Sequence, residues 1–197
     1  MAIPPLENPL ETFQQWLEEA QACHTIDEPT AMTLATVTPD GRPDARVVLL
    51  KGFDEDGFVF YTNLTSTKAM QLQHTPHAAL CFHWMPLSKQ VRIQGAVESV
   101  SDAEADAYFA SRPRQSQLGA WASKQSQPVE SRLELEKRLA KYTAKFNIGK
   151  VPRPDFWSGF RLHPERIEFW LKQPYRLHDR LEYTRTESGW DTRRLFP

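Results

Sequence analysis

The chain has 197 residues, of which 40% are hydrophobic and 11% aromatic, and its 24 Lys and Arg nearly balance its 25 Asp and Glu. This composition supplies a globular core and excludes an intrinsically disordered chain, while the net charge of −1 argues against a general nucleic-acid binder. The longest uninterrupted apolar run covers only residues 78–82, and because a membrane span needs about 20 apolar residues, a transmembrane helix is also excluded.

Residues 1–28 predict an N-terminal helical segment. Asn8 is a favourable N-cap, Pro9 suits the first helical position, and Glu11 completes a pattern like a capping box. Apolar residues then recur at helical spacing to about Cys23.

From residue 30 onward, β-branched and apolar residues predict strands. The strands of this first half cover residues 30–38, 46–53, 58–62, 78–84 and 90–100, with a short helix at 66–73. Turn sequences rich in Asp and Gly separate the first three strands. Because a parallel crossover needs a dozen or more residues, connections this short favour antiparallel pairing.

Residues 101–150 predict a helical insertion. Ser101 and Glu104 form a capping box that begins a helix to about Ala110, and apolar spacing predicts a longer helix over 129–146. The polar segment between these helices is expected to form loops. The tail returns to strands, at residues 156–162, 167–171, 181–185 and 190–195.

These elements predict a mainly β fold, an antiparallel barrel with peripheral helices, in a single domain over residues 1–197. The N-terminus shows no secretory signal, and the two cysteines offer no disulfide framework, so we expect a cytoplasmic protein. His74, His77 and His83 have no thiolate or carboxylate at ligand spacing, so we expect no metal site.

The charges are unevenly distributed along the chain. Residues 1–40 hold seven of the acidic residues and no Lys or Arg, so the remainder carries an excess of six positive charges. A nearly neutral chain can therefore contain a cationic pocket. No two glycines stand two apart, so the glycine-rich phosphate loops are absent. Any bound phosphate must be held by side chains and helix ends.

Several cationic segments could bind an anion, and each has a plain structural alternative. In an extended segment, Arg176, His178 and Arg180 share a face, which fits an anion site and a solvated edge strand about equally well. Arg46 and Lys51 begin and end an apolar strand, and their spacing sends them to opposite faces. Charged ends of a buried strand are the simpler interpretation of that pair.

Two further segments are rich in hydrogen-bond donors. Ser66, Thr67 and Lys68 begin the short predicted helix, where hydroxyls, backbone N–H groups and a cation can hold a phosphate. An ordinary helix cap is the simpler interpretation. The polar segments at 112–116 and 124–126 could hold a phosphate or be exposed turns.

Taken together, seven segments resemble one family. They are Arg-Val-Val-Leu-Leu-Lys at 46–51, Tyr-Thr-Asn at 61–63, Ser-Thr-Lys at 66–68, Ser-Arg-Pro-Arg-Gln-Ser at 111–116, Trp-Ala-Ser-Lys-Gln-Ser at 121–126, Phe-Trp-Ser-Gly-Phe-Arg at 156–161 and Arg-Leu-His-Asp-Arg at 176–180. In order and spacing the chain resembles the pyridoxamine 5′-phosphate oxidases over essentially its whole length. Each segment alone is a weak signal, but seven in order are specific.

The resemblance implies an FMN-binding split β-barrel of the antiparallel Greek-key type, with FMN at the interface of a homodimer. It implies that pyridoxamine 5′-phosphate and pyridoxine 5′-phosphate are oxidised to pyridoxal 5′-phosphate, while O2 is reduced to H2O2. The expected partners are therefore phosphorylated B6 vitamers, O2 and a second copy of the chain, with no nucleic acid and no membrane.

The resemblance also assigns roles to individual residues. The FMN-binding set is Arg46, Val47, Val48, Leu49, Leu50, Lys51, Tyr61, Thr62, Thr67, Lys68, Gln90, Gln125, Ser126, Trp170 and Arg180. Within this set, the residues expected to bind the FMN phosphate are Arg46, Lys68, Gln125 and Ser126. The substrate-binding set is Lys51, Tyr108, Arg112, Ser116, Arg176, Leu177 and His178. Of these, Arg176 and His178 are the expected catalytic residues, which close over the pyridine ring and orient it.

Two departures from the family pattern stand out. The family usually has Arg at the position of Thr67, so we expect weaker FMN binding. Family members also often carry an N-terminal extension that covers the substrate, and we expect that cover to be missing or replaced here. Two alternatives remain open, namely a split-barrel flavin reductase acting on another substrate, and a non-catalytic carrier of FMN or pyridoxal phosphate.

Overall fold

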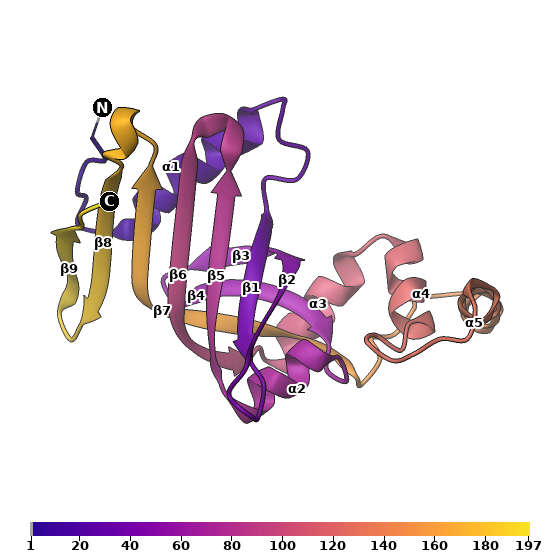
Figure 1. Cartoon of the computed structure of the whole chain (residues 1–197). Coiled ribbons are helices and arrows are strands. Elements are labelled where there is room, and N and C mark those ends of the chain that lie inside the picture. The colour runs from indigo at the N-terminus through magenta and orange to yellow at the C-terminus, as the bar shows by residue number, and fades with distance from the viewer. Residues whose placement is uncertain (1) are drawn as a thin grey trace.

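In the computed structural model, which describes residues 2–197, nine strands form one antiparallel sheet (Figure 1). The strands are β1 (Ala31–Val37), β2 (Pro43–Leu49), β3 (Gly52–Asp54), β4 (Gly57–Asn63), β5 (His77–Trp84), β6 (Lys89–Ser99), β7 (Trp157–Leu171), β8 (Asp179–Thr186) and β9 (Gly189–Arg194). Their order is β2-β1-β5-β6-β7-β4-β3, with β8 paired to β7 and β9 to β8. The predicted antiparallel fold is confirmed. Met1, where the predicted domain begins, lies outside the described residues.

The strand predicted over 46–53 is wrong as a single element, because the chain changes partner in its middle. β2 pairs with β1 at one end of the sheet, and β3 pairs with β4 at the other. The Leu50 N–H donates to the Thr30 carbonyl and the Lys51 N–H to the Val59 carbonyl, each at 2.9 Å. Two neighbouring residues thus join opposite ends of the sheet. Within residues 2–197 no pairing of β2 with β4 closes the seam, so the barrel is split.

β7 is one strand, although its sequence predicts two. Its register with β6 shifts between Gln94 and Gly95, so that Arg166 faces Gln94, Pro164 faces Gly95 and Glu165 has no partner in the ladder. Such a bulge tolerates a proline inside a central strand, because the ladder there needs no donor. A side chain at Gly95 would place its Cβ 1.8 Å from a β7 carbonyl oxygen. The strand therefore bends at the bulge but does not end.

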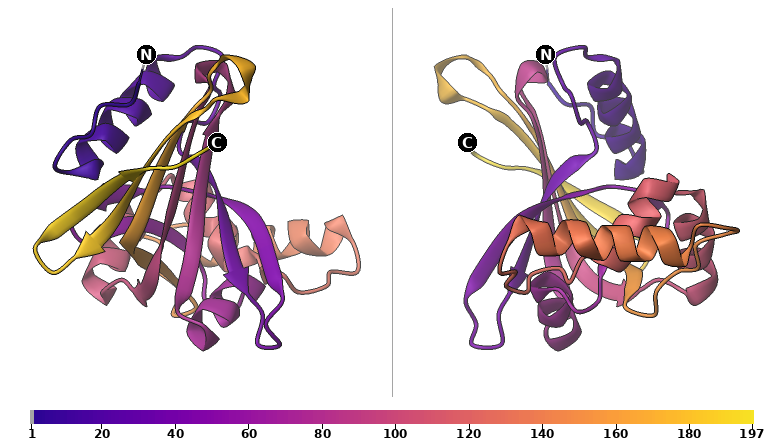
Figure 2. Two further views of the ribbon diagram at one scale, coloured as in Figure 1. Left: turned by 60° about the vertical axis from the view of Figure 1, so that its left-hand side comes forward. Right: turned by 90° about the vertical axis from the view of Figure 1, so that its right-hand side faces the viewer.

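The N-terminal helix covers one face of the sheet (Figure 2). α1 (Pro9–Ala22) begins as predicted, since the Asn8 side chain accepts a hydrogen bond from the Leu10 N–H. Phe13 is fully buried and its ring lies edge-on to Phe53 and Phe58 at 4.8 and 5.0 Å. α1 thus packs its apolar face into the main hydrophobic core.

The remaining helices lie at the far end of the barrel. They are α2 (Thr67–His74), α3 (Asp102–Ser111), α4 (Arg114–Ala122) and α5 (Arg132–Lys145), and the 3-10 turns are η1 (Met85–Leu87) and η2 (Pro174–Arg176). The Ser101 cap is confirmed, because its Oγ accepts from the Glu104 N–H at 3.2 Å. The loop expected at 112–116 is wrong: only Arg112 and Pro113 are non-helical, and α4 follows.

α4 and α5 project from the barrel as an arm, away from β8 and β9 (Figure 1). α5 begins three residues later than predicted, after the Ser131 cap, and buries none of its residues within this chain. No helix in the described part of the chain is long and apolar enough to cross a membrane.

Candidate functional site

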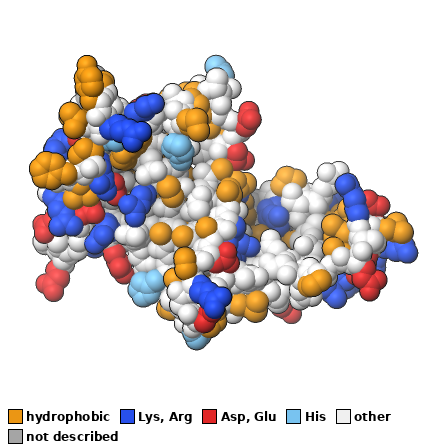
Figure 3. All heavy atoms as spheres, viewed as in Figure 1, with side chains coloured by type: hydrophobic (Ala, Val, Ile, Leu, Met, Phe, Trp, Pro, Cys, Tyr) orange, Lys and Arg blue, Asp and Glu red, His pale blue; other side chains and the backbone are white. Residues whose placement is uncertain are grey.

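A cavity of about 960 Å³ lies along the open seam of the barrel. It is bordered by β2, β4, α2, the junction of α3 with α4, and the start of β7. β2 is the last strand of its end of the sheet, so its outer edge has no strand partner, and four consecutive residues, 46–49, line the cavity. Figure 3 shows Lys and Arg side chains in the hollow between the barrel and the helical arm.

The cavity brings together many of the predicted residues, namely Arg46, Val47, Val48, Leu49, Lys51, Tyr61, Thr62, Lys68, Tyr108, Arg112, Ser116 and Gln125. Its described lining includes four cations and no Asp or Glu. Arg46 and Lys51 both border it despite the expected opposite faces, because the chain leaves its strand between them. Leu50 is buried in the core instead, and Thr67 and Ser126 lie beside the cavity without lining it.

Lys68 is a buried cation whose hydrogen-bond partners are neutral. Its Nζ lies 3.2 Å from Gln125 Oε1 and 3.4 Å from Thr62 Oγ1, and within the described residues it forms no ion pair. Burial lowers the pKa of Lys68, and the nearby charge of Arg46 lowers it further. A desolvated ammonium without an anion is costly, so this arrangement fits a bound anion.

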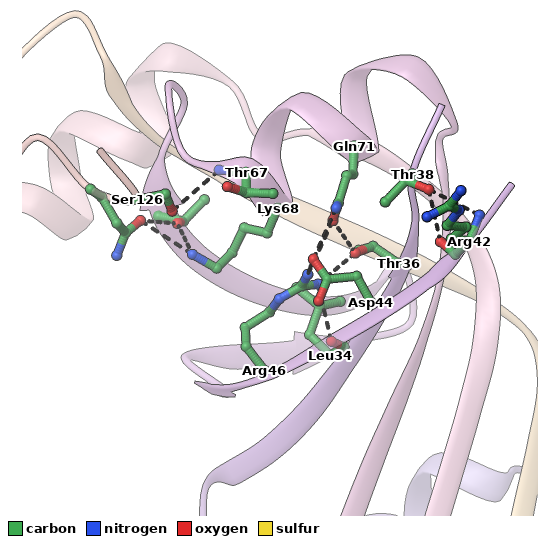
Figure 4. Close-up of polar contacts among 12 residues, drawn as sticks. Leu34, Thr36, Thr38, Arg42, Asp44, Arg46, Thr67, Lys68, Gln71 and Ser126 are labelled. Atoms are coloured by element: carbon green, nitrogen blue, oxygen red, sulfur yellow. Dashed lines mark hydrogen bonds and ion pairs between the residues drawn. The ribbon is translucent and has the colours of Figure 1, made fainter. Parts of the chain in front are cut away.

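The first turn of α2 adds further donors beside Lys68 (Figure 4). The Thr67 N–H donates to Ser126 Oγ at 3.3 Å, and Ser126 adopts a left-handed backbone with a φ of 67°. Ser66 Oγ is buried and has no hydrogen-bond partner among the described residues. An orphaned hydroxyl, a helix N-terminus and a buried ammonium together fit a phosphate group.

A stack of aromatic rings forms another wall. The rings of Tyr61, Tyr108 and Trp157 are nearly parallel, and the Tyr61 ring centroid lies 3.9 Å from that of Tyr108 and 5.3 Å from that of Trp157. Burial and the negative charge of Glu104 raise the pKa of Tyr61 to about 12, and burial raises the pKa of Tyr108. Both phenols therefore remain protonated at neutral pH. The Tyr61 hydroxyl donates to Glu104 Oε1 at 3.4 Å, which leaves the Tyr108 hydroxyl as the one that can donate into the cavity.

Arg112 is another lining cation that forms no ion pair within the described residues. Its guanidinium lies 4.7 Å from the Trp157 ring centroid, and its Nη1 is buried without a partner in the described chain. Burial lowers the pKa of Arg112. Cation–π contact holds the group in place but satisfies no N–H donor, so these donors remain for a ligand.

Sequence reasoning missed four polar or aromatic lining residues, which are Asn63, Ser111, Ser123 and Trp157. All four lie inside the seven segments quoted above, so the family resemblance covered these residues but assigned them no role. Trp157 matters most, because it contacts both Arg112 and the tyrosine stack. No group of three or more potential metal ligands occurs within residues 2–197.

The other predicted residues lie away from this cavity, at the opposite end of the molecule (Figures 1 and 2). They are Gln90, Trp170, Arg176, Leu177, His178 and Arg180. The extended face predicted at 176–180 is wrong, because Tyr175 and Arg176 have φ values of 57° and 62° and form the turn η2. His178 instead lies against Trp170, at a ring distance of 4.5 Å.

Arg180 belongs to a row of charges across β6, β7, β8 and β9. Glu168 and Glu182 face each other on β7 and β8, and both are buried. Glu168 accepts hydrogen bonds from Arg180 at 2.8 Å and from Arg92 at 3.1 Å, while Glu182 pairs with Arg193 at 2.6 Å. Hydrogen bonding to Glu168 raises the pKa of Arg180. The row fixes Arg180 at the sheet surface.

The fold and the cavity together define the class of protein. The split antiparallel barrel has the fold of a pyridoxamine 5′-phosphate oxidase-related, FMN-binding protein from Nostoc punctiforme, with a TM-score of 0.75 at 21% identity, and it carries a cationic cavity along its seam. Residues 17–146 match the family model described as pyridoxamine 5′-phosphate oxidase, and residues 157–197 match the pyridoxine 5′-phosphate oxidase C-terminal dimerisation region. The chain belongs to the pyridoxamine 5′-phosphate oxidase family, and the resemblance noted in its sequence is confirmed.

Curated relatives and solved structures agree with this assignment. Pyridoxine/pyridoxamine 5′-phosphate oxidase of Brucella anthropi is 58% identical over 96% of this chain and 94% of its own. The protein of that name from Caulobacter vibrioides is 58% identical over 98% of this chain and 88% of its own. The crystal structure of PhzG from Burkholderia lata 383, in complex with tetrahydrophenazine-1-carboxylic acid, has a TM-score of 0.91 at 33% identity, covering 98% and 94% of the two chains.

Proposed function

We propose that this protein is an FMN-dependent oxidase that converts pyridoxamine 5′-phosphate and pyridoxine 5′-phosphate to pyridoxal 5′-phosphate, with O2 reduced to H2O2. The observation that carries the proposal is a pair of cations on different walls of one cavity, the buried Lys68 and the half-buried Arg112, neither of which forms an ion pair within the described residues. Two such cations suit two phosphorylated ligands, the cofactor and the substrate. Curated relatives 56–58% identical carry the same activity in their names.

The residues around α2 fit the phosphate of FMN. Lys68 supplies the charge, while Ser66, Ser126 and the N-terminus of α2 supply neutral donors. The chemistry that FMN supplies when bound is acceptance of a hydride from the substrate carbon and transfer of the electrons to O2. The protein needs no strong base of its own for that chemistry, and the described cavity lining contains no carboxylate or histidine.

The residues around Arg112 fit the phosphate of the substrate. Arg112 offers its unpaired Nη1, and Lys51, Tyr108 and Ser116 line the cavity with it. Charge-assisted hydrogen bonds of this kind contribute about 1.5–3 kcal/mol each. Several together hold the substrate in one orientation against the loss of its freedom, so that the reacting carbon stays close to the flavin.

The protein acts as a homodimer, and we infer that each cavity is completed by the partner subunit. Arg176 and His178 lie in the segment that matches the dimerisation region, and neither lines the cavity of its own chain. Exposed apolar side chains surround them, with Tyr175 92%, Leu177 67% and Phe196 95% exposed. Covering these side chains with a second copy would bring Arg176 and His178 over the substrate in the partner's cavity.

PhzG supplies a specific competing candidate, because its structure contains a reduced phenazine carboxylic acid rather than a B6 vitamer. The paired cations here favour a phosphate, which carries more charge and more acceptor oxygens than a carboxylate. We further propose a cytoplasmic location, which the two unpaired cysteines support.

The test is an assay of pyridoxal 5′-phosphate and H2O2 formation from both vitamers, with and without added FMN. The expected result is a yellow protein that forms both products in equal amounts. If the flavin-loaded protein oxidises tetrahydrophenazine-1-carboxylic acid but neither vitamer, its substrate is of the kind bound in the PhzG structure. Vitamer and FMN binding without turnover would support a carrier. A protein that gains no flavin absorbance would contradict the proposal.

A further inference from the structure

Arg46 lines the cavity, yet most of its polar contacts lie behind it in the protein (Figure 4). Its Nη1 donates to the Leu34 carbonyl at 3.2 Å and to Thr36 Oγ1 at 2.5 Å. Its Nη2 lies 3.0 Å from Gln71 Oε1 and 2.6 Å from Asp44 Oδ2. No described residue accepts a hydrogen bond from Nε, so the side chain keeps a donor for an anion.

Gln71 connects all the side chains that hold this guanidinium. It lies one helical turn after Lys68 on α2 and is only 3% exposed. Its Oε1 accepts hydrogen bonds from Arg46 and from Thr36, the latter at 2.5 Å, and its Nε2 donates to Asp44 Oδ2 at 2.9 Å. That last hydrogen bond lowers the pKa of Asp44. Every polar contact of the Gln71 amide is therefore with Arg46 or with a group that itself binds Arg46.

We propose that Gln71 is a positioning residue, which holds the Arg46 guanidinium at the phosphate end of the cavity without cancelling its charge. The proposal rests on FMN binding as proposed above. A carboxylate at this position could accept the same hydrogen bonds, but it would neutralise Arg46 and repel Asp44. A neutral amide fixes the geometry and adds no second negative charge to the Arg46 guanidinium, which already pairs with Asp44 at 2.6 Å. α2 thus contributes one phosphate contact directly, through Lys68, and a second indirectly, through Gln71.

The experiment compares FMN with riboflavin, which has the same ring system but no phosphate. The full-length chain, freed of flavin, is titrated with each ligand, and the two dissociation constants are measured by fluorescence. For Gln71→Leu we expect FMN binding to weaken about tenfold or more, because an unfixed guanidinium loses a charge-assisted hydrogen bond. Riboflavin binding should change by less than about twofold, since the affected contact is to the phosphate alone.

Further variants sharpen the test. Gln71→Glu keeps the acceptor oxygens but adds a charge, and it should weaken FMN binding while sparing riboflavin. Thr36→Val removes only the hydroxyl that accepts from Arg46 Nη1, so it should weaken FMN binding less than Gln71→Leu does, again while sparing riboflavin binding. Gln73→Leu is the matched control, because Gln73 is exposed on the same helix, and it should leave both constants unchanged. Adding Gln71→Leu to Arg46→Met should weaken FMN binding no further than Arg46→Met alone.

The outcomes separate this inference from the proposed function. An equal loss of FMN and riboflavin affinity in Gln71→Leu would reduce Gln71 to a structural residue and overturn the inference. Unchanged FMN affinity would overturn it as well. If the unaltered protein binds FMN no better than riboflavin, the phosphate assignment of the cavity fails and the inference fails with it. If it binds neither flavin, the proposed function itself fails.

Discussion

Replacing Arg112 with Met should separate activity from stability, because the two depend on this side chain in opposite directions. If Arg112 binds the substrate phosphate, the loss of one charge-assisted hydrogen bond of about 1.5–3 kcal/mol lowers kcat/KM by about 10- to 150-fold. The same change removes a buried, unpaired Nη1 donor. It relieves a desolvation cost of about 1–3 kcal/mol and forfeits cation–π contact worth about 0.5–1 kcal/mol. The melting temperature should therefore stay unchanged or rise by up to about 5 °C.

Arg114 provides the matched control. It lies two residues further along, outside the cavity lining, and donates to the carbonyl oxygens of Phe146 and Gly149, the latter at 2.9 Å. Arg114→Met should lower the melting temperature by about 2–6 °C through the loss of two hydrogen bonds. Its kcat/KM should remain within about twofold of the unaltered protein, because the lost contacts lie outside the cavity.

The assay measures kcat/KM for pyridoxamine 5′-phosphate at saturating FMN, and thermal unfolding of the same preparations. Saturating FMN prevents a change in cofactor binding from being mistaken for a change in substrate binding. The reasoning is refuted if Arg112→Met loses stability in proportion to activity, or if both variants lose activity equally. Either result would mean that Arg112 supports the α3–α4 junction rather than the substrate.

Three further predictions follow from other charged groups. Burial holds the pKa of Lys68 below its ordinary 10.5, so between those two pKa values the unfolded chain binds more protons than the folded one. The free energy of unfolding of the flavin-free protein, measured in urea, should therefore increase as pH rises through that interval, and Lys68→Met should lack this increase. Thr67→Arg should tighten FMN binding about three- to tenfold by adding a cation beside the phosphate site, and an unchanged dissociation constant would show that no contact forms. Glu168→Gln should lower the melting temperature by about 2–8 °C, because it leaves Arg92 and Arg180 without their shared carboxylate; a calorimetric scan that superimposes on that of the unaltered protein would contradict this.

The elements that were predicted well depend on local signals. Asn8 and Ser101 cap their helices as predicted, because a cap needs only the side chain and the next few backbone N–H groups. The partner change at Leu50 and the bulge opposite Gly95 depend on strands far away in the sequence. Hydrophobic alternation contains no information about which neighbour a strand pairs with, so neither feature could be predicted from it.

The same division holds for the site. The family resemblance identified cations such as Lys68 and Arg112, which the structure places at one cavity. It attached no role to Trp157, which supports Arg112, or to Gln71, which supports Arg46. A supporting residue acts through a neighbour in space, and its sequence context resembles that of any buried aromatic or helical amide. Such residues become visible only when contacts and unpaired donors are known.

The outer edge of β2 has a consequence for the protein before it is loaded. β2 pairs with β1 on one side only, so every second residue of segment 46–49 presents backbone N–H and C=O groups that no strand within the described chain pairs. Val47 in this segment is 66% exposed. An unpaired edge of this kind is a template onto which another chain can add a strand. Ligands in the cavity and a second subunit beside it would shield that edge from solvent. Newly made chains that lack flavin should therefore aggregate more readily than flavin-bound chains. The supply of cofactor during synthesis should then affect the yield of folded protein.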